Sequence, residues 1–234
     1  RSIGDMARQI KVLMQDIVAE HESKRKREFD TLQSQINPHF LYNTLDIIVW
    51  MIENEQKSEA VRVVTALARF FRISLSKGKS ILPVRDELEH VRNYLMIQQM
   101  RFKNKFTYTI DAAPEVLGSA SLKLMLQPLV ENAVLHGVDG AEHGEIWVRA
   151  REQDGKLQIQ VLDNGRGLPT ELLGPYARRD RELSRGHLGL YNVDTILIKY
   201  YGEGFGLYLE NRTDGPGAVV TATLPIRREE KAQC

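Results

Sequence analysis

Residues 126–137 read LQPLVENAVLHG, an apolar run with helical spacing that is interrupted by Glu131, Asn132 and His136. Asn132 and His136 are one turn apart, so they share a face of the predicted helix. Mg²⁺ takes amide oxygen readily and keeps waters and phosphate oxygens as its other ligands, and a histidine can donate a hydrogen bond to phosphate. Taken alone, the run predicts either a metal and phosphate site or a helix with polar residues at its solvent edge.

A loop directly after a predicted strand reads DNGRGLP over residues 163–169. The carboxylate of Asp163, at the strand end, can accept a hydrogen bond from an adenine amino group. Gly165 and Gly167 allow the backbone to approach a flat ring closely. An ordinary glycine-rich turn is the alternative for this loop by itself.

A second loop, RGHLGL over residues 185–190, runs straight into a predicted helix. The backbone amides of Gly186 and Gly189 would then lie at a helix N-terminus, which favours phosphate. A loop followed by a simple helix cap is the alternative. A further glycine turn, DGPG at residues 214–217, leads into the last predicted strand.

The most unusual stretch is QINPHFLYN at residues 35–43, where a proline falls inside a predicted helix. Such a proline removes a hydrogen bond at a cost of about 3 kcal/mol, so its presence suggests a function. His39 is predicted to point away from the apolar stripe between residues 41 and 52, with Asn43 on its own face. A neutral imidazole is a capable nucleophile at pH 7, although an ordinary surface histidine is the alternative.

The spacing of apolar residues divides the chain into three parts and a tail. Residues 1–30 carry the a/d spacing of a coiled coil. Residues 31–104 read as long amphipathic helices, which predict a helical hairpin that forms a four-helix bundle in a parallel homodimer. Residues 105–228 mix strands and helices in an order that predicts a sheet with helices on one face. The fold class is therefore α+β, and residues 229–234 form the tail.

The individual elements follow from the same patterns of apolar residues and turn signals. Helices are predicted at 41–52, 59–75, after Pro83, 122–136 and 190–200, and strands at 106–110, 146–149, 157–162, 206–210 and 219–224. A hairpin turn is predicted at Asp154-Gly155, between two of these strands.

The bulk composition excludes some classes of protein. The net charge is +1, so bulk charge gives no reason to expect a nucleic-acid partner. The single cysteine, Cys234, cannot form an internal disulfide, which fits a reducing compartment. No apolar run reaches the roughly 18 residues that a membrane span needs. The chain begins at Arg1 rather than Met, so we expect a fragment from which an N-terminal part is missing.

The order of the motifs is an asparagine helix, an Asp-Gly loop, a glycine loop before a helix and a final glycine turn. This order resembles the ATP-binding domain of the GHKL superfamily, a Bergerat α/β sandwich. The motif QxNPHFLYNTL at residues 35–45 is similar to the histidine box of LytS/YesM-type sensor histidine kinases. Residues 94–102 resemble the second helix of that subfamily's dimerisation region, and residues 3–8 resemble a HAMP signalling helix. The resemblance covers essentially the whole chain.

The resemblance implies an ATP-dependent kinase that phosphorylates its own His39, with Asn43 able to hydrogen-bond to the imidazole. Asn132 would hold Mg²⁺, and Asp163 would bind the adenine. The other positions implied to contact ATP are His136, Gly165, Gly167, Gly186, Gly189 and Leu190. Residues 169–185 would form a mobile lid over the phosphates.

The same resemblance implies partners and a location. The phosphoryl group would pass to an aspartate on the receiver domain of a response regulator. The chain would act as a homodimer. We expect a membrane anchor in the missing N-terminal part, so that this chain is the cytoplasmic portion of an inner- or plasma-membrane sensor.

Two positions bear on the chemistry. Many histidine kinases carry an acidic base directly after the phosphoacceptor, but Phe40 stands here, as the subfamily pattern expects, so the base is not identified and Glu131 is a candidate for it. Pro128 occupies the position of the water-activating glutamate of the ATP-hydrolysing members, which favours transfer to a protein histidine over hydrolysis. There are two alternatives. A GHKL-type serine kinase is disfavoured by the histidine box. A catalytically silent scaffold is disfavoured because the metal asparagine and the adenine aspartate are both present.

Overall fold

The computed structural model describes residues 38–75, 80–138, 143–175 and 188–226. It divides the chain into a first unit, residues 1–40, and a second unit, residues 41–234. The predicted coiled coil and the C-terminal tail lie outside the described residues. Among the helices that are described, none combines the length and the apolar character needed to cross a membrane.

Two helices come first in the described chain, α2 (Pro38–Glu53) and α3 (Lys57–Ser74), and they confirm the two helices predicted there. The turn between them is short, and Glu55 adopts a positive φ of 60° in it. The face of α3 that is buried carries the residues Ala60, Val63, Ala66, Phe70 and Ser74. These positions recur every three or four residues, as expected for an amphipathic helix with one packed face.

The apolar stripe predicted for α2 is only partly buried in the single chain. Ile48 is buried, but Leu45 is 45 % exposed and Ile52 is 55 % exposed. The buried face of α2 instead runs through Phe40, Thr44, Ile48 and Met51. A wide apolar surface of this helix is therefore left uncovered within one chain.

A six-stranded sheet forms the centre of the second unit, in the strand order β2-β4-β5-β8-β7-β6. Its strands are β2 (Phe106–Ala112), β4 (Gly144–Gln153), β5 (Lys156–Asp163), β6 (Gly174–Pro175), β7 (Gly206–Asn211) and β8 (Ala218–Pro225). The β2–β4 pair is parallel and the other pairs are antiparallel. The predicted hairpin turn is confirmed, since Asp154 and Gly155 both adopt positive φ between β4 and β5.

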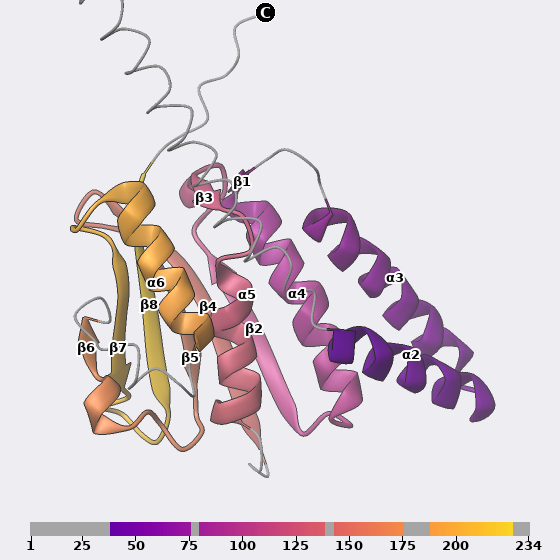
Figure 1. Cartoon of the computed structure of the whole chain (residues 1–234). Coiled ribbons are helices and arrows are strands. Elements are labelled where there is room, and N and C mark those ends of the chain that lie inside the picture. The colour runs from indigo at the N-terminus through magenta and orange to yellow at the C-terminus, as the bar shows by residue number, and fades with distance from the viewer. Residues whose placement is uncertain (1–37, 76–79, 139–142, 176–187, 227–234) are drawn as a thin grey trace, which may run out of the picture. The chain divides into compact units, whose positions relative to one another are not determined.

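Three helices cover one face of this sheet, α4 (Val84–Arg101), α5 (Leu126–Asn132) and α6 (Leu188–Tyr201), which lie side by side in Figure 1. Alternate residues of the strands point under these helices and are buried, as Ile146 and Val148 of β4 and Ile159 of β5 show. The α+β class and the arrangement of helices on one face of a sheet are thereby confirmed.

Helix α4 packs on two sides. It contacts α3 on one side, and on the other it contacts α5, β2 and the small antiparallel pair β1 (Ile81–Pro83) and β3 (Ala120–Leu122). Its N-terminus is hydrogen-bonded to that region, through the amide of Val84 to the carbonyl of Ser119. The division at residue 104 stays a prediction, but a catalytic unit that keeps these contacts has to begin before β1.

The start of α5 differs from the sequence expectation. The helix begins at Leu126 rather than at residue 122, because residues 120–122 pair with β1 and Leu124 adopts a positive φ of 62°. Glu87 of α4 takes the place of a local cap: its carboxylate accepts hydrogen bonds from the amides of Leu124, at 2.6 Å, and Leu126, at 3.2 Å. Glu87 is fully buried, and this burial raises its pKa to about 7.

We predict that Glu87→Ala lowers the free energy of unfolding by about 2–3 kcal/mol, because it leaves buried backbone amides at the start of α5 without an acceptor. Urea unfolding followed by circular dichroism measures the change. Glu89→Ala is the matched control, since it removes a carboxylate from the same helix without touching α5. Equal losses in the two variants would contradict the capping role.

Candidate nucleotide site

Asp163 is the last residue of β5, and its side chain is 5 % exposed. Its Oδ1 accepts hydrogen bonds from the backbone amide of Gly165, at 2.9 Å, and from that of Ala218, at 3.4 Å. Burial raises the pKa of this carboxyl, and the two amides work against that rise. The predicted adenine ligand is thus a buried, partly satisfied acceptor at the carboxyl end of a central strand.

Three glycines make this position of Asp163 possible. A Cβ placed on Gly137 would lie 2.6 Å from Cγ of Asp163. A Cβ on Gly217 would overlap the carbonyl oxygen of Asp163, and one on Gly165 would overlap the carbonyl oxygen of Gly137. The backbone therefore closes around the carboxylate from three segments, and any larger residue at these positions would force them apart.

Sequence reasoning identified Gly165 but missed Gly137 and Gly217 as parts of the site. Gly137 directly follows the asparagine helix, and Gly217 directly precedes the last strand. Both positions were visible as glycines beside a motif. What the sequence did not reveal is that both glycines lie against Asp163, Gly137 against its carboxylate and Gly217 against its backbone carbonyl.

Asn211 is a second residue that sequence reasoning missed. Its amide group clamps the loop after Asp163, because Oδ1 accepts from the amide of Leu168 at 2.6 Å and Nδ2 donates to the carbonyl of Leu168 at 2.9 Å. Gly167 adopts a positive φ of 77° there, and a Cβ on it would lie 2.8 Å from Oδ1 of Asn211. The loop is therefore held to β7 as well as to β5, and an asparagine at a strand end gave no advance signal of this.

Asn132 is the last residue of α5, and the helix continues in π form over Ala133–Gly137. Single π turns of this kind often lie at functional sites. His136 falls in this segment, with its Nδ1 3.5 Å from Nη2 of Arg166 in the loop after β5. The structure thus brings the asparagine helix, His136 and the Asp163 loop together, as the sequence predicted.

The two sides of α5 face different neighbours. Pro128 lies against α6, because a Cβ on Gly189 would sit 3.2 Å from Cβ of Pro128, and Asn132 is one turn further along the same side. Gln127 and Glu131 lie on the side of α4, where Nε2 of Gln127 donates to Oε1 of Glu131 at 2.7 Å. The role of Glu131 as a base stays a prediction, and its place beside α4 favours a positioning role instead.

The remaining predicted residues have simple surroundings. Leu190 is buried, with 1 % of its surface exposed, so it belongs to the packed inner side of α6. Gly186 and most of the predicted lid lie outside the described residues. His39 is exposed on α2, and Asn43 follows it one turn later on the same helix.

A metal ion has few ligands to choose from in this region. Across residues 38–75, 80–138, 143–175 and 188–226, no group of three or more His, Cys, Asp or Glu side chains could hold one. A single amide oxygen from Asn132 nevertheless fits Mg²⁺, which usually keeps several waters and binds substrate phosphates. The donor set therefore suits a metal that arrives with a nucleotide rather than one held in a protein cage.

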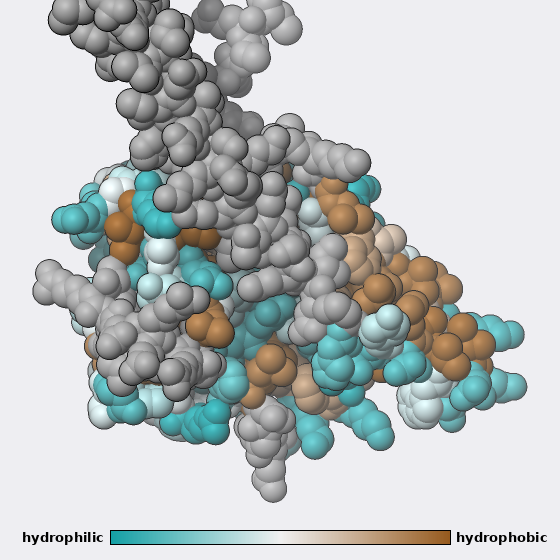
Figure 2. Space-filling view, viewed as in Figure 1, coloured by the Kyte–Doolittle hydropathy of each residue, from teal (hydrophilic) through white to brown (hydrophobic). Residues whose placement is uncertain are grey.

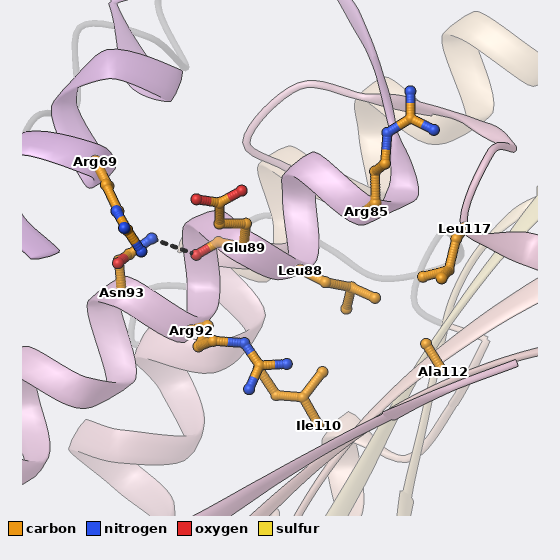
Figure 3. Close-up of a pocket in the computed structure, with 9 residues that line it drawn as sticks. All are labelled: Arg69, Arg85, Leu88, Glu89, Arg92, Asn93, Ile110, Ala112 and Leu117. Atoms are coloured by element: carbon orange, nitrogen blue, oxygen red, sulfur yellow. Dashed lines mark hydrogen bonds between the residues drawn. The ribbon is translucent and has the colours of Figure 1, made fainter. Parts of the chain in front are cut away.

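A separate pocket of about 450 Å³ lies between α3, α4 and the edge strand β2. Figure 3 shows Arg69 from α3 and Arg85, Glu89 and Arg92 from α4 around an apolar floor that includes Ile110. Residues 126–137 and 163–169 contribute nothing to its lining. This pocket is therefore distinct from the predicted nucleotide site.

Comparison with known families agrees with this geometry. Residues 27–106 match the family model described as "Histidine kinase", and residues 118–228 match the model described as "Histidine kinase-, DNA gyrase B-, and HSP90-like ATPase". The chain belongs to the sensor histidine kinase family. The family assignment made from the motifs is confirmed, and membership of the second family implies that this histidine kinase binds ATP.

Relatives of this histidine kinase carry the names of sensor proteins. Sensor histidine kinase YesM of Bacillus subtilis is 32 % identical over 96 % of the chain, and Sensor protein LytS of Oceanobacillus iheyensis is 32 % identical over 88 %. The chain spans only 38 % and 36 % of the length of these two proteins. Among solved structures, the catalytic domain of histidine kinase ThkA is 21 % identical with a TM-score of 0.49, over 64 % of this chain and 97 % of that domain.

We predict that Gly217→Ala weakens binding of an ATP analogue at least tenfold and lowers the free energy of unfolding by about 2 kcal/mol or more. The added Cβ overlaps the backbone of Asp163, and the residue has a φ of 122° that side chains rarely adopt. Calorimetry and urea unfolding measure the two effects.

Gly215→Ala is the control for this prediction, because it lies in the same turn and a Cβ on it meets nothing within 4 Å. It should stay within about 0.5 kcal/mol of the parent. If both alanines behaved alike, the close approach of Gly217 to Asp163 would not matter for the site.

Proposed function

We propose that this chain is the catalytic portion of a two-component sensor histidine kinase, which uses ATP to phosphorylate His39 and passes the phosphoryl group to an aspartate of a response-regulator receiver domain. The observation that carries the proposal is the buried carboxylate of Asp163, closed in by three glycines beside the asparagine helix. Membership of the family supports it, and the exposed His39 supplies a nucleophile.

The hydrogen bonds of Asp163 support an adenine site. Both backbone amides donate to Oδ1, and Oδ2 is the oxygen to which the structure assigns no donor among the residues that it describes. An ionised carboxylate has room for about four donors on its two oxygens. The exocyclic amino group of adenine would supply the donor that the protein does not.

Phosphate charge would be met at the other end of the site. Asn132 would hold Mg²⁺, which when bound neutralises phosphate charge during phosphoryl transfer. Arg166 places a guanidinium beside His136, so a second cation lies next to the same π turn. These residues orient and neutralise the phosphates, which is most of what this reaction requires of a protein.

The transfer itself would use the lone pair of a neutral imidazole nitrogen of His39. The new P–N bond forms to the γ-phosphorus as the bond to the ADP oxygen breaks, and the ring then loses its other N–H proton. Hydrolysis is disfavoured because Pro128 stands where the ATP-hydrolysing members carry a water-activating glutamate, and proline cannot act as a base. A carboxylate of the receiver domain then accepts the phosphoryl group.

The names and lengths of the relatives support a proposal about where in the cell this chain acts. Its relatives are named as sensors and are more than twice its length. We place a membrane anchor in the remaining part, and this chain on the cytoplasmic side, where ATP and response regulators are found.

We predict that His39→Gln abolishes labelling by γ-labelled ATP and changes the affinity for a non-hydrolysable analogue by less than about twofold. The substitution removes the nucleophile from α2 without altering the Asp163 region. In the parent, the label should be lost in acid, as expected for phosphohistidine. Acid-labile label that persisted in His39→Gln would show that another residue accepts the phosphoryl group.

We predict different defects for the two ligand residues. Asp163→Ala should weaken binding of the analogue with or without Mg²⁺, because it removes the adenine acceptor and leaves buried amides unpaired, a loss of a few kcal/mol at most. Asn132→Asp should chiefly change the difference between the affinity for the analogue in Mg²⁺ and the affinity in EDTA. Calorimetry in Mg²⁺ and in EDTA separates the two. Parent-like affinity in Asp163→Ala would disprove the adenine assignment.

The exposed apolar surface of α2 and α3 supports a homodimer. Figure 2 shows a brown, hydrophobic surface on its right, over these two helices. The large apolar and aromatic side chains of α2 and α3 that are about half exposed or more are Tyr42, Leu45, Val49, Trp50, Ile52, Val61 and Val64. Each large apolar side chain that is fully buried contributes roughly 1.5–3 kcal/mol. Several such residues from each chain, although already about half buried, can together offset an association cost of roughly 4–15 kcal/mol.

We predict that the chain is a dimer in solution at micromolar concentration and that the double substitution Ile52→Glu, Val61→Glu makes it monomeric. Both residues line one apolar groove between α2 and α3, so two carboxylates there would be costly to bury. Tyr208→Glu is the control, since Tyr208 is a 46 % exposed apolar residue on β7. Light scattering measures the mass of each variant in solution. A monomeric parent would contradict the proposed four-helix bundle.

A further inference from the structure

A row of buried and half-buried side chains joins α3 to α5 across α4. The ring of Phe70 on α3 stacks on the imidazole of His90 on α4, with centroids 4.2 Å apart and planes 19° from parallel. Nε2 of His90 lies 2.9 Å from Oε1 of Gln127 on α5, and Gln127 in turn reaches Glu131. His90 and Phe70 are almost wholly buried, so the row runs through the interior.

With Glu131 ionised, the hydrogen bonds of the row take one set of directions. A carboxylate only accepts, so the amide group of Gln127 donates to Glu131 through Nε2 and accepts at Oε1. His90 must then donate from Nε2, which requires the neutral tautomer that carries its proton there. Burial lowers the pKa of His90 to about 4, so the ring stays neutral at physiological pH and this arrangement persists.

The row ends next to the proposed metal ligand. Glu131 directly precedes Asn132, where the regular helix gives way to the π turn of Ala133–Gly137. Helix α5 has only seven residues, so its own hydrogen bonds determine its rotation weakly. Holding Gln127 and Glu131 against α4 places Asn132 about 100° further round the helix, on the side of Pro128, which lies against α6.

We propose that His90 and Gln127 are positioning residues, which set the rotation of the Asn132 turn and make it depend on the place of Phe70, and hence of α3. This proposal rests on the proposed kinase function, because it takes Asn132 as the Mg²⁺ ligand. In this arrangement, a series of side-chain contacts connects α3, which follows the helix of His39, to the proposed nucleotide site. A displaced α3 moves the Phe70 ring, the His90 donor follows, and Gln127 loses its alignment.

The experiment measures the affinity of the full chain for a non-hydrolysable ATP analogue in Mg²⁺ and in EDTA, and takes the ratio. Gln127→Leu breaks both links of the row, and His90→Phe keeps the ring stacked on Phe70 but removes the donor. We expect each to lower the ratio about fivefold or more, with the affinity in EDTA within about twofold of the parent. The double variant should be no worse than either single one, because both act through one chain of contacts.

Gln99→Leu is the matched control. Gln99 also lies on α4 and also donates a part-buried hydrogen bond, from Nε2 to the carbonyl of Phe106 at 2.9 Å, but it is outside the row. It should destabilise the fold without changing the ratio. If it lowered the ratio as much as Gln127→Leu, or if Gln127→Leu kept the parent ratio, the positioning role would be overturned.

The link to α3 is tested by Phe70→Leu, which keeps an apolar side chain but removes the ring. It should lower the ratio in the same direction, and a parent-like ratio would overturn the route through α3. None of these measurements needs phosphoryl transfer. The two proposals can therefore fail separately. If the parent bound the analogue with Mg²⁺ but took no label on His39, the kinase proposal would be refuted. The affinity ratios would still test the positioning role of His90 and Gln127.

Discussion

The nucleotide site depends on one constraint, the enclosure of the Asp163 carboxylate by backbone that only glycine can form. Gly137 lies against the carboxylate, Gly217 against its backbone carbonyl, and Gly165 against Gly137, so that three chain segments meet where a side chain would separate them. Burying a carboxylate is costly unless donors reach it, and here two backbone amides do so on one oxygen. The fold thus holds a desolvated carboxylate whose two donors, among the described residues, both reach the same oxygen.

The short helix α5 is positioned by its neighbours at both ends. A helix of seven residues is too short to be stable on its own in water. At its start, the buried carboxylate of Glu87 accepts from the amides of Leu124 and Leu126, and beyond its end Gly137 packs against Asp163. Two buried carboxylates from other elements therefore set where α5 and its last residue, Asn132, lie. The raised pKa of each of these carboxyls reflects the cost of that arrangement.

Local patterns predicted most of the fold, and long-range contacts account for what they missed. Period-two alternation gave β4 and β5, and the Asp154-Gly155 signal gave their hairpin, because these features depend on neighbouring residues. The late start of α5 depends on Glu87, which is 37 residues away from Leu124 in the chain. Asn211 clamps Leu168 across 43 residues, and no local pattern marks such a pair. Motif order compensated in part, since it led to the expectation that the asparagine helix lies beside the Asp163 loop, and Gly137 at the end of that helix does lie against Asp163.

Helix α4 lies between α3 and α5, so a movement of α3 would reach α5 through α4. Its first amides are bound to the segment before β3, and its Glu87 holds the start of α5, so α4 belongs mechanically to the sheet. Its contact with α3 is mainly one of side-chain packing, in which the Phe70–His90 stack is buried. Packed rings can slide at less cost than the buried hydrogen bonds at the start of α5 can be broken. Displacement of α3 should therefore be taken up at this stack first, and His90 is the residue there that is also hydrogen-bonded to the asparagine helix.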